Sequence, residues 1–337
     1  MPHEPLRLGL VGAGTIAERH VAAATALPDV TITAIADTDL GAANRLASSC
    51  GAATYPDHTT MFGVGGLDAA VIAVPHALHA PITRDAAAAG LHILVEKPIA
   101  TTIADATAMI DECRTAGVVL AVGHVLHFVP GMVAAQRLLR CGDLGTPLAA
   151  VDRRTASYSF GSRPGWFFDP VAAGGGVLLN VGIHSIDKLQ WLLNAPAVRA
   201  AGRTATRDGL SVETEALALL EMAGGIPATV SLTGTGLPFT DVTEIVCTKG
   251  ALRLSLTDGV WAYPSDGPGR QLAAAGSDEL PTAFAAQLAD FARACRTGQP
   301  PAVAGEYGRS VLATALAVYA SADGGQFIHI PREESTI

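Results

Sequence analysis

The first 123 residues alternate short apolar runs with longer alanine-rich segments, several of which end at glycine or proline. The apolar runs have the length of buried strands, and the alanine-rich segments have the length of helices. Because parallel strands must be joined by crossover segments, this alternation predicts a doubly wound, parallel α/β sheet. The expected strands are Leu6–Val11, Val30–Ala36, Ala69–Val74, Leu91–Val95 and Val118–Val122. In such folds, ligands bind at the edge where the carboxyl ends of the strands meet.

The pattern changes after residue 145, where strand-like runs follow one another with short turns such as TDGV between some of them. One helix, Val177–Asn194, interrupts the strands, and two more helical stretches follow at about 282–297 and 305–322. This order predicts an α+β domain with a large, mostly antiparallel open sheet and helices on one face. We therefore expect two domains, residues 1–123 and 124–337, with the helix at about 305–322 able to pack back on the first domain.

The composition narrows the choice of partners and compartment. The formal net charge is −9 and no cluster of lysine and arginine occurs, which disfavours nucleic acid and anionic membranes as partners. No apolar run reaches the roughly 18 residues of a membrane span, and the N-terminus lacks the pattern of a secretion signal. The five cysteines lie far apart without a CxxC pair, and the histidines show no metal-ligand spacing. We therefore expect a cytoplasmic protein with reduced cysteines and no bound metal.

A glycine loop, GAGTIA at residues 12–17, joins the first expected strand to the first expected helix. Gly12 permits a tight turn, Gly14 lets the backbone approach a pyrophosphate, and Ala17 lets the helix pack close to the strand. Thr15 and Ile16 lie in the first turn of that helix, whose N-terminal N–H groups face the anion. The alternative is a tight turn with no ligand. The strand before the loop, the helix after it and an acidic residue at the expected distance favour a dinucleotide site.

Asp37 is that acidic residue, at the end of the second expected strand and 20 residues beyond Ala17. Its carboxylate is placed to accept hydrogen bonds from the adenosine ribose, and its charge would repel a 2′-phosphate. The next residues, Thr38 and Asp39, supply no arginine to offset this charge, and Arg45 on the following helix is a lone cation. The sequence therefore favours NAD over NADP.

Further segments that end strands on the same edge carry histidines and a lysine. The expected cofactor contacts there are Val74, Pro75, His76, His79, Glu96 and Lys97. A dehydrogenase needs a group that exchanges a proton with a hydroxyl while hydride moves to the nicotinamide ring. Lys97 can serve if its surroundings favour the neutral amine. The alternative is that Lys97 is a solvated loop charge.

The helix expected at Val177–Asn194 carries a polar stripe between two apolar faces. At 100° per residue, Asn180, His184 and Asp187 lie in one narrow band flanked by leucine, isoleucine and valine. A helix that is apolar on both flanks is largely buried, so we expect this band to line an internal cleft. The alternative is a buried histidine that is satisfied by a bridge to Asp187.

Together these segments resemble the glucose–fructose oxidoreductase/inositol dehydrogenase family (Gfo/Idh/MocA). The likeness rests on the glycine loop, on DAAVIAVPHALHAPITRDAAAAGLHILVEKPIA and on GGGVLLNVGIHSIDKLQWLL, and it runs in order from Leu6 to about Leu193. The resemblance implies a nicotinamide-binding Rossmann domain and a C-terminal sheet domain that binds substrate. It also implies a homodimer or homotetramer formed through that sheet, acid–base roles for Lys97 and His184, and a floor under the nicotinamide shaped by Glu96 and Pro98.

Two positions depart from the pattern of this family. Asn180 stands where the polyol dehydrogenases of the family commonly have aspartate, and an amide can orient a hydroxyl but cannot share its proton charge. His76 stands where the motif P-N-x-x-H usually has asparagine, which alters contacts near the cofactor ribose. Since Lys97 and His184 are both present, we expect the chemistry to be intact, with Asn180 orienting the hydroxyl.

Candidate substrate contacts concentrate in residues 152–170, which are rich in aromatic and basic side chains. Tyr158 and Trp166 suit stacking on the apolar face of a sugar ring, and Arg153 suits hydroxyls or a carboxylate. Alternatively, Arg153 and Arg154 alternate on a sheet and one of them is simply solvated. His124, after the last strand of the first domain, is either a cleft residue or a structural histidine. The expected substrate site is completed by Lys97, Asn180 and His184.

The leading prediction is an NAD(P)-dependent oxidoreductase that moves hydride between nicotinamide and a secondary hydroxyl or ketone. The substrate is expected to be a sugar, a sugar derivative or a cyclic polyol such as inositol. Two other classes stay open: an NAD-dependent glycosidase that uses transient oxidation, and a non-catalytic dinucleotide-binding sensor. The presence of Lys97 and His184 counts against the sensor.

Overall fold

The computed structural model describes residues 4–207, 209–235, 239–276 and 279–331, which form two compact units. The first comprises the described residues within Met1–Phe128 and Asp278–Arg309, and the second those within Val129–Ser277 and Ser310–Ile337. This division differs from the single boundary expected after residue 123. The difference arises because helix α9 (Glu279–Thr297) packs against α1 (Thr15–Thr25) of the first unit.

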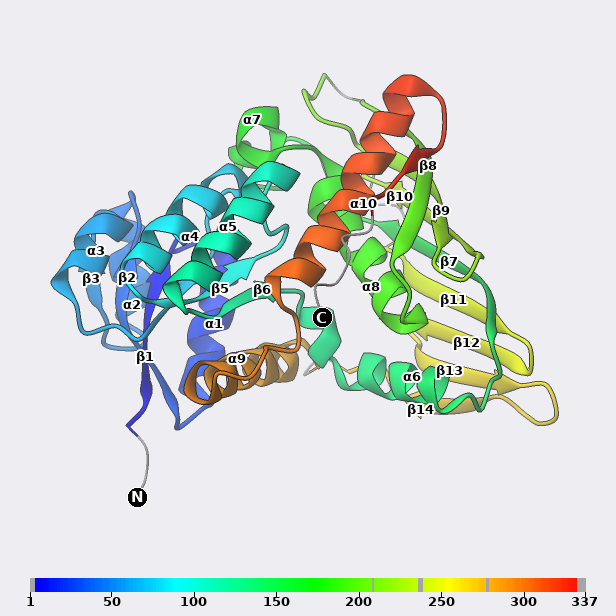
Figure 1. The fold of residues 1–337 in the computed structure, drawn as a ribbon, viewed down its shortest axis with the longest axis horizontal. Coiled ribbons are helices and arrows are strands. Elements are labelled where there is room, and N and C mark those ends of the chain that lie inside the picture. Colours follow the sequence, from blue (N-terminus) through cyan, green and yellow to red (C-terminus); the bar gives the residue numbers. More distant parts are fainter. Residues whose placement is uncertain (1–3, 208, 236–238, 277–278, 332–337) are drawn as a thin grey trace. The chain divides into compact units, whose positions relative to one another are not determined.

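The first unit is built on a parallel sheet (Figure 1). In its described part, six strands pair in the order β3-β2-β1-β4-β5-β6, every pair parallel. The strands are β1 (Leu6–Val11), β2 (Val30–Ala36), β3 (Ala53–Tyr55), β4 (Ala69–Ile72), β5 (His92–Glu96) and β6 (Leu120–Gly123). This order is that of a doubly wound Rossmann fold, which confirms the predicted α/β class.

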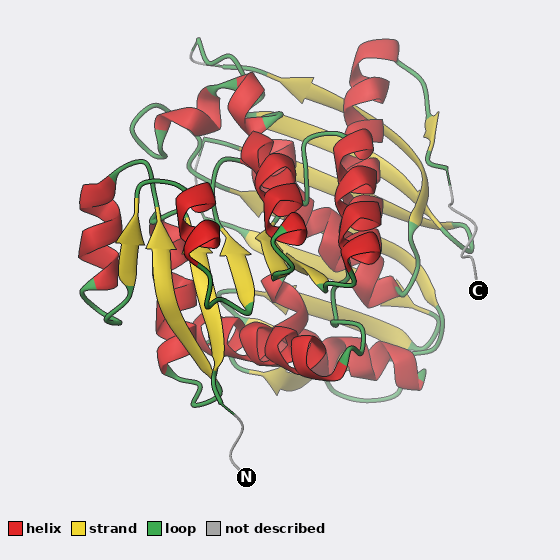
Figure 2. Ribbon diagram, turned by 60° about the vertical axis from the view of Figure 1, so that its left-hand side comes forward, coloured by secondary structure: helices red, strands yellow, loops and turns green. Residues whose placement is uncertain are grey.

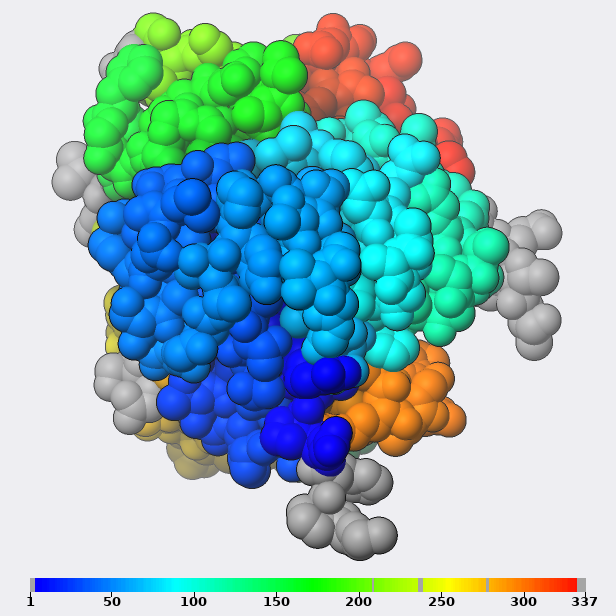
Figure 3. Space-filling model, turned by 90° about the vertical axis from the view of Figure 1, so that its left-hand side faces the viewer, coloured from blue at the N-terminus to red at the C-terminus, as the bar shows by residue number. Residues whose placement is uncertain are grey.

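Helices cover this sheet and complete its core. They are α1, α2 (Leu40–Ala47), α3 (His58–Val64), α4 (His79–Ala88), α5 (Ile103–Ala116) and α9, with short turns η1 (His76–Leu78) and η2 (Val125–Phe128). Figure 3 shows α9, in orange, beside the dark blue start of the chain, although the two are distant in sequence. The contact includes a 3.7 Å ion pair between Arg296 and Asp29. The first unit is therefore completed by a segment that follows most of the second unit in the chain.

The second unit is built on a larger sheet. Nine strands in its described residues pair in the order β14-β13-β12-β11-β7-β10-β9-β8-β15, and only the β7–β10 pair among them is parallel. They are β7 (Pro147–Thr155), β8 (Ala197–Ala205), β9 (Glu215–Met222), β10 (Ile226–Thr233), β11 (Asp241–Cys247), β12 (Gly250–Ser255), β13 (Gly259–Pro264), β14 (Arg270–Ala273) and β15 (Ile328–His329). The predicted mostly antiparallel sheet is thereby confirmed.

Helices of the second unit lie on one face of this sheet (Figures 1 and 2). They are α6 (Pro130–Cys141), η3 (Gly165–Phe168), α7 (Pro170–Ala173), the π-helical turn η4 (Leu178–Gly182), α8 (Ile183–Leu193) and α10 (Gly305–Gly324). The residues of α10 up to Arg309 belong to the first unit, and those from Ser310 onward belong to the second. Further along, α10 covers β8, where a Cβ on Gly202 would lie 2.5 Å from Val318.

The opposite face of this sheet carries exposed apolar side chains. Val151 on β7, Leu217 and Leu219 on β9, and Val246 on β11 are each more than two-fifths exposed. They belong to one face. Val151 and Leu219 are both paired with Thr229 of β10, and directly paired residues on neighbouring strands point to the same side of a sheet. Large exposed apolar side chains that cluster on a sheet face are typical of a surface that another protein covers.

Candidate active site

The glycine loop has the geometry that an anion site requires. Gly12 adopts φ = +98°, and a Cβ at this position would clash with the carbonyl oxygen of Ala73. Gly14 is the N-cap residue of α1, with no side-chain cap, and a Cβ there would meet nothing within 4 Å. Thr15 and Ile16 are exposed, while Ala17 is fully buried against the sheet. The start of α1 is therefore exposed and has no side-chain cap, as a pyrophosphate site needs.

Asp37 is fixed beside this loop by its own hydrogen bonds. Its carboxylate accepts a 2.7 Å hydrogen bond from the backbone N–H of Ala13 and a 2.8 Å hydrogen bond from that of Asp39. Asp39 in turn caps α2, and the exposed Arg45 lies 3.9 Å from Asp39. The acidic group is thus preorganised next to the glycine loop, and Arg45 already has a carboxylate partner in Asp39.

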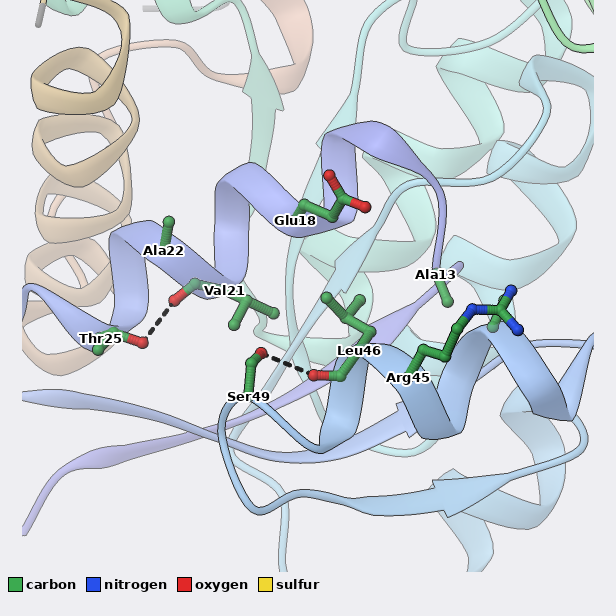
Figure 4. A pocket seen from close by; sticks show the side chains of 9 residues that line it. Ala13, Glu18, Val21, Ala22, Thr25, Arg45, Leu46 and Ser49 are labelled. Atoms are coloured by element: carbon green, nitrogen blue, oxygen red, sulfur yellow. Dashed lines mark hydrogen bonds between the residues drawn. The ribbon is translucent and has the colours of Figure 1, made fainter.

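A groove of about 670 Å³ runs between α1 and α2 (Figure 4). Its lining residues are Ala13, Glu18, Val21, Ala22, Thr25, Ala42, Arg45, Leu46 and Ser49. Only Ala13 of the glycine loop reaches it, and no predicted cofactor residue lines it. The groove therefore lies beside the predicted cofactor site rather than within it.

His79 joins the two loops that follow β4 and β5. Its Nδ1 lies 2.8 Å from the carbonyl oxygen of Pro98, and its Nε2 lies 3.0 Å from that of Val74. The side chain is fully buried, and this burial lowers the pKa of His79. Neighbouring His76 is also buried and contacts the His79 ring at 5.7 Å between centroids. The two histidines predicted as cofactor contacts are therefore buried, and His79 can act on a cofactor only through the loops that it joins.

Glu96 and Lys97 stand at the carboxyl end of β5, next to Gly123 of β6. The Glu96 carboxylate lies 2.9 Å from Nε2 of His20 on α1, a partner that the sequence analysis missed. Burial alone would raise the pKa of Glu96, but the hydrogen bond and charge of His20 and the charge of Lys97 hold it below its usual value. Lys97 is half-buried, on a turn with a cis peptide bond before Pro98.

His124 follows β6 and lies within an aromatic cluster of the first unit. The side chain is fully buried, with its ring 6.0 Å from that of Tyr307, which also contacts His127 at 5.2 Å. This surrounding favours the structural alternative for His124 over a direct substrate contact.

The segment that carries Asn180 and His184 differs from the regular helix expected at Val177–Asn194. Asn180 lies in the π-helical turn η4, and His184 lies in the first turn of α8, which follows it. A Cβ on Gly182 would clash with Leu232 of β10, and the Arg154 guanidinium donates to the carbonyl oxygen of Val181 at 3.3 Å. Asn180 is buried and His184 half-buried. Close packing on the sheet thus accompanies the change of helical period at this point.

Glu213 binds the backbone at the start of η4, and its position accounts for the glycines at 175 and 176. Its carboxylate accepts backbone hydrogen bonds from Gly176 at 2.7 Å and Leu178 at 2.9 Å, and one from the Tyr319 hydroxyl at 2.6 Å. A Cβ on Gly176 would clash with Glu213, and one on Gly175 with Tyr319. Burial raises the pKa of Glu213. Gly175 and Gly176 are therefore required by the close approach of a buried acid and a tyrosine.

A buried group of charges lies between α8 and the sheet. The Lys188 ammonium is 2.8 Å from carboxylate oxygens of both Asp152 on β7 and Asp241 on β11, and Arg154 also pairs with Asp241. The Thr243 hydroxyl donates to Asp152 at 2.7 Å. No sequence pattern indicated this network, which fixes α8 and η4 on the sheet.

Of the predicted substrate contacts in residues 152–170, Tyr158 and Arg153 lie in surroundings other than expected. Tyr158 is only 1% exposed and donates its hydroxyl to the carbonyl oxygen of Phe167 at 3.0 Å, so its ring is not available for stacking on a sugar. Arg153 is exposed on the sheet face opposite Asp152, and hence opposite α8, so it is the solvated arginine of the pair. Trp166 is half-buried and its ring lies 3.9 Å from that of Phe167.

Within the described residues, no group of three or more histidine, cysteine, aspartate or glutamate side chains is arranged to hold a metal ion. Among the same residues, none of the helices has both the length and the apolar character that crossing a membrane demands.

The parallel sheet and the open glycine loop define a dinucleotide-binding protein. Residues 6–124 match the family model of an oxidoreductase family with an NAD-binding Rossmann fold, and residues 132–253 match the C-terminal domain of the same family. The chain belongs to the Gfo/Idh/MocA oxidoreductase family. The predicted family and enzyme class, an NAD(P)-dependent oxidoreductase, are thereby confirmed.

Known relatives cover nearly the whole chain. D-xylose 1-dehydrogenase (NADP(+)) 2 of Haloferax volcanii is 30% identical over 96% of this chain and 100% of its own length. The 1,5-anhydro-D-fructose reductase of Ensifer adhaerens is 30% identical over 96% and 98%. Levoglucosan dehydrogenase, in complex with NADH and levoglucosan, has a TM-score of 0.91 at 21% identity, over 98% of this chain and 100% of its own, and supports the fold.

Proposed function

We propose that this protein is a dehydrogenase or reductase that acts on a secondary hydroxyl or ketone of a sugar, a sugar derivative or a cyclic polyol. The observation that carries the proposal is the position of Lys97. It stands at the carboxyl edge of the first unit's sheet, on a turn that His79 ties to the loop after β4. The sugar dehydrogenases and reductases among its relatives support the substrate class.

The residues present fit a nicotinamide dinucleotide. The uncapped start of α1 after Gly14 suits the pyrophosphate, and the preorganised carboxylate of Asp37 suits the ribose hydroxyls. The bound cofactor supplies the carbon that accepts or donates hydride. In the oxidation direction, Lys97 takes the hydroxyl proton as its carbon loses hydride, with His184 as the second acid–base group and Asn180 orienting the oxygen. In reduction, the same residues return the proton.

We further propose that NAD is preferred over NADP. The charge of Asp37 next to the ribose site and the pairing of Arg45 with Asp39 support this preference. The NADP-dependent relative from Haloferax volcanii makes the choice of cofactor the first thing to measure.

The first unit is proposed to bind the dinucleotide and the second the substrate, in a cytoplasmic homodimer or homotetramer. The exposed apolar side chains on the open face of the large sheet, such as Val151 and Leu219, support an interface between subunits there. The glycosidase and sensor alternatives gain no support from the relatives described above.

The test combines the purified protein with NAD or NADP and a panel of aldoses, inositols and sugar acids. Formation of reduced nicotinamide is followed by its near-ultraviolet absorbance. We expect turnover with one substrate class, and a loss of about 100-fold or more in Lys97→Met, with dinucleotide binding retained. Lys249→Met, at an exposed lysine on the turn between β11 and β12, is the matched control. Full activity of Lys97→Met would refute the proposal, and free sugar released from a glycoside without net NADH would favour the glycosidase.

A further inference from the structure

We propose that His20 is a positioning residue that acts on Lys97 through Glu96. By holding one oxygen of the buried carboxylate, His20 limits how strongly Glu96 stabilises the lysine ammonium. The inference rests on the proposed role of Lys97 as the proton-transfer group. If His20 acts in this way, a residue on α1 helps to set the pH range in which the reaction proceeds.

The geometry confines the Glu96 carboxylate. His20 is fully buried, with its Nε2 2.9 Å from Oε1 of Glu96 and its ring edge-on to Phe284 of α9 at 5.3 Å. The other carboxylate oxygen accepts a 3.4 Å hydrogen bond from the backbone N–H of Lys97. On the remaining side, a Cβ on Gly123 would lie 2.9 Å from the carboxyl carbon. The carboxylate is therefore held between α1, the lysine backbone and β6.

The charges around this carboxylate couple it to the lysine. The pKa of Glu96 is lowered by three charged or titratable groups, which are His20 on α1, Lys97 itself and His79 on α4. Because a Coulomb interaction is mutual, Glu96 favours the protonated form of Lys97 as much as Lys97 favours the carboxylate. A protonated amine cannot accept the hydroxyl proton of a substrate. If both oxygens of Glu96 interacted with the Lys97 ammonium, Lys97 would stay protonated at neutral pH, and oxidation of the substrate would be suppressed.

Two substitutions at this pair should shift the lysine in opposite directions. Glu96→Gln keeps the shape and removes the negative charge, so Lys97 should lose its proton at a lower pH. His20→Leu frees Oε1 of Glu96 for the lysine and removes any positive charge on the imidazole. Both effects stabilise the ammonium, so Lys97 should lose its proton at a higher pH. A merely structural role for His20 predicts no such pair of opposite shifts.

The titration of Lys97 can be measured because the chain contains few lysines. The chain contains three lysines, Lys97, Lys188 and Lys249, so ¹³C-dimethylated protein gives few signals to assign. The titration midpoint of Lys97 is read from its methyl shift against pH in the full chain without cofactor. We expect displacements of about one pH unit, downward in Glu96→Gln and upward in His20→Leu. The matched control is His58→Leu, because His58 pairs with Asp85 at the same 2.9 Å distance elsewhere in the first unit.

Displacements of opposite sign that exceed the change in His58→Leu support the proposal. Displacements of the same sign, or none beyond the control, overturn it. If His20→Leu does not fold, His20→Met replaces it as a second apolar variant. The labelling needs neither cofactor nor turnover, so an inactive protein refutes the proposed function and leaves this result readable. In active protein, the acid limb of kcat/KM for oxidation should move with the Lys97 midpoint.

Discussion

The Lys188 ammonium lies 2.8 Å from a carboxylate oxygen of Asp152, and both side chains are almost fully buried. Asp241 and Arg154 extend this pair into a network of two acids and two bases beneath α8. A buried ion is tolerated only when its partners compensate the loss of water, so each member of the network depends on the others.

Removing the central cation should therefore be costly. In Lys188→Met, two buried carboxylates lose a partner, and we expect the free energy of unfolding to fall by about 3–5 kcal/mol. The measurement is chemical denaturation of both proteins under the same conditions. Lys249→Met, at an exposed lysine, should change stability by no more than about 0.5 kcal/mol. Equal stabilities of the two variants would show that the buried network contributes nothing net.

Asp241 gives the same network a pH dependence. Burial would raise the pKa of Asp241, but the charges of Arg154 and Lys188 outweigh it and lower the pKa to about 2. A carboxyl whose pKa is depressed in the folded state stabilises the protein above its unfolded value, near 4, and this contribution is lost as pH falls toward 2.

We therefore expect the loss of unfolding free energy below pH 4 to be smaller in Asp241→Asn than in the unmodified protein, by about 2 kcal/mol. Stability is compared by urea denaturation at several pH values between 2 and 7. Asp143→Asn, at an exposed aspartate, is the control and should leave the pH dependence unchanged. Parallel curves for Asp241→Asn and the unmodified protein would contradict the assignment.

The cofactor preference should depend on Asp37. Since its carboxylate is proposed to bond the adenosine ribose, Asp37→Ala should lower kcat/KM for NAD by about tenfold and improve the ratio of NADP to NAD. Asp39→Ser separates this effect from the nearby charge, because serine can still cap α2. We expect Asp39→Ser to retain activity with NAD. Steady-state rates with each dinucleotide test both variants, and an unchanged ratio in Asp37→Ala would remove the basis for the preference.

The open face of the large sheet should control assembly. Leu219→Lys places a charge among exposed apolar side chains that include Val151 and Leu217, and burying a lysine in an interface is unfavourable. We expect this variant to have a lower molar mass than the unmodified protein by light scattering after size-exclusion chromatography. Leu280→Lys, at an exposed leucine on α9 of the first unit, should leave the mass unchanged. The same mass for all three proteins would place the interface elsewhere.

Local sequence patterns predicted the parts of the fold that depend on periodicity. Alternation of apolar runs and helices indicated the parallel sheet, and the glycine loop appeared between β1 and α1 as expected. Two strands were not predicted, β3 (Ala53–Tyr55) and β14 (Arg270–Ala273). Each is too short to show the alternation of apolar and polar residues that marks a strand. The helices α3 and α6 were also not predicted. The segment around α3 contains several glycines, and α6 begins with a proline.

Contacts between distant residues could not be predicted in this way. His20 and Glu96 are 76 residues apart, and Glu213 meets Gly176 across 37 residues, so no local spacing connects them. The π-helical turn at Asn180 likewise depends on Leu232 and Arg154, which lie on strands of the sheet. The aromatic ring of Tyr158 suggested a stacking contact with a sugar, whereas its burial and its hydrogen bond to Phe167 are properties of the folded loop.

The return of α9 to the first unit has a consequence for how this protein is made. His20 on α1 contacts Phe284 of α9, which the ribosome adds only after strands β7 to β14 of the large sheet have been synthesised. During translation, the surface of α1 that packs against α9 therefore stays uncovered until the intervening strands have been synthesised. A fragment that stops near residue 128 would retain the parallel strands and lack this cover. Such fragments should depend on chaperones more than the full chain does.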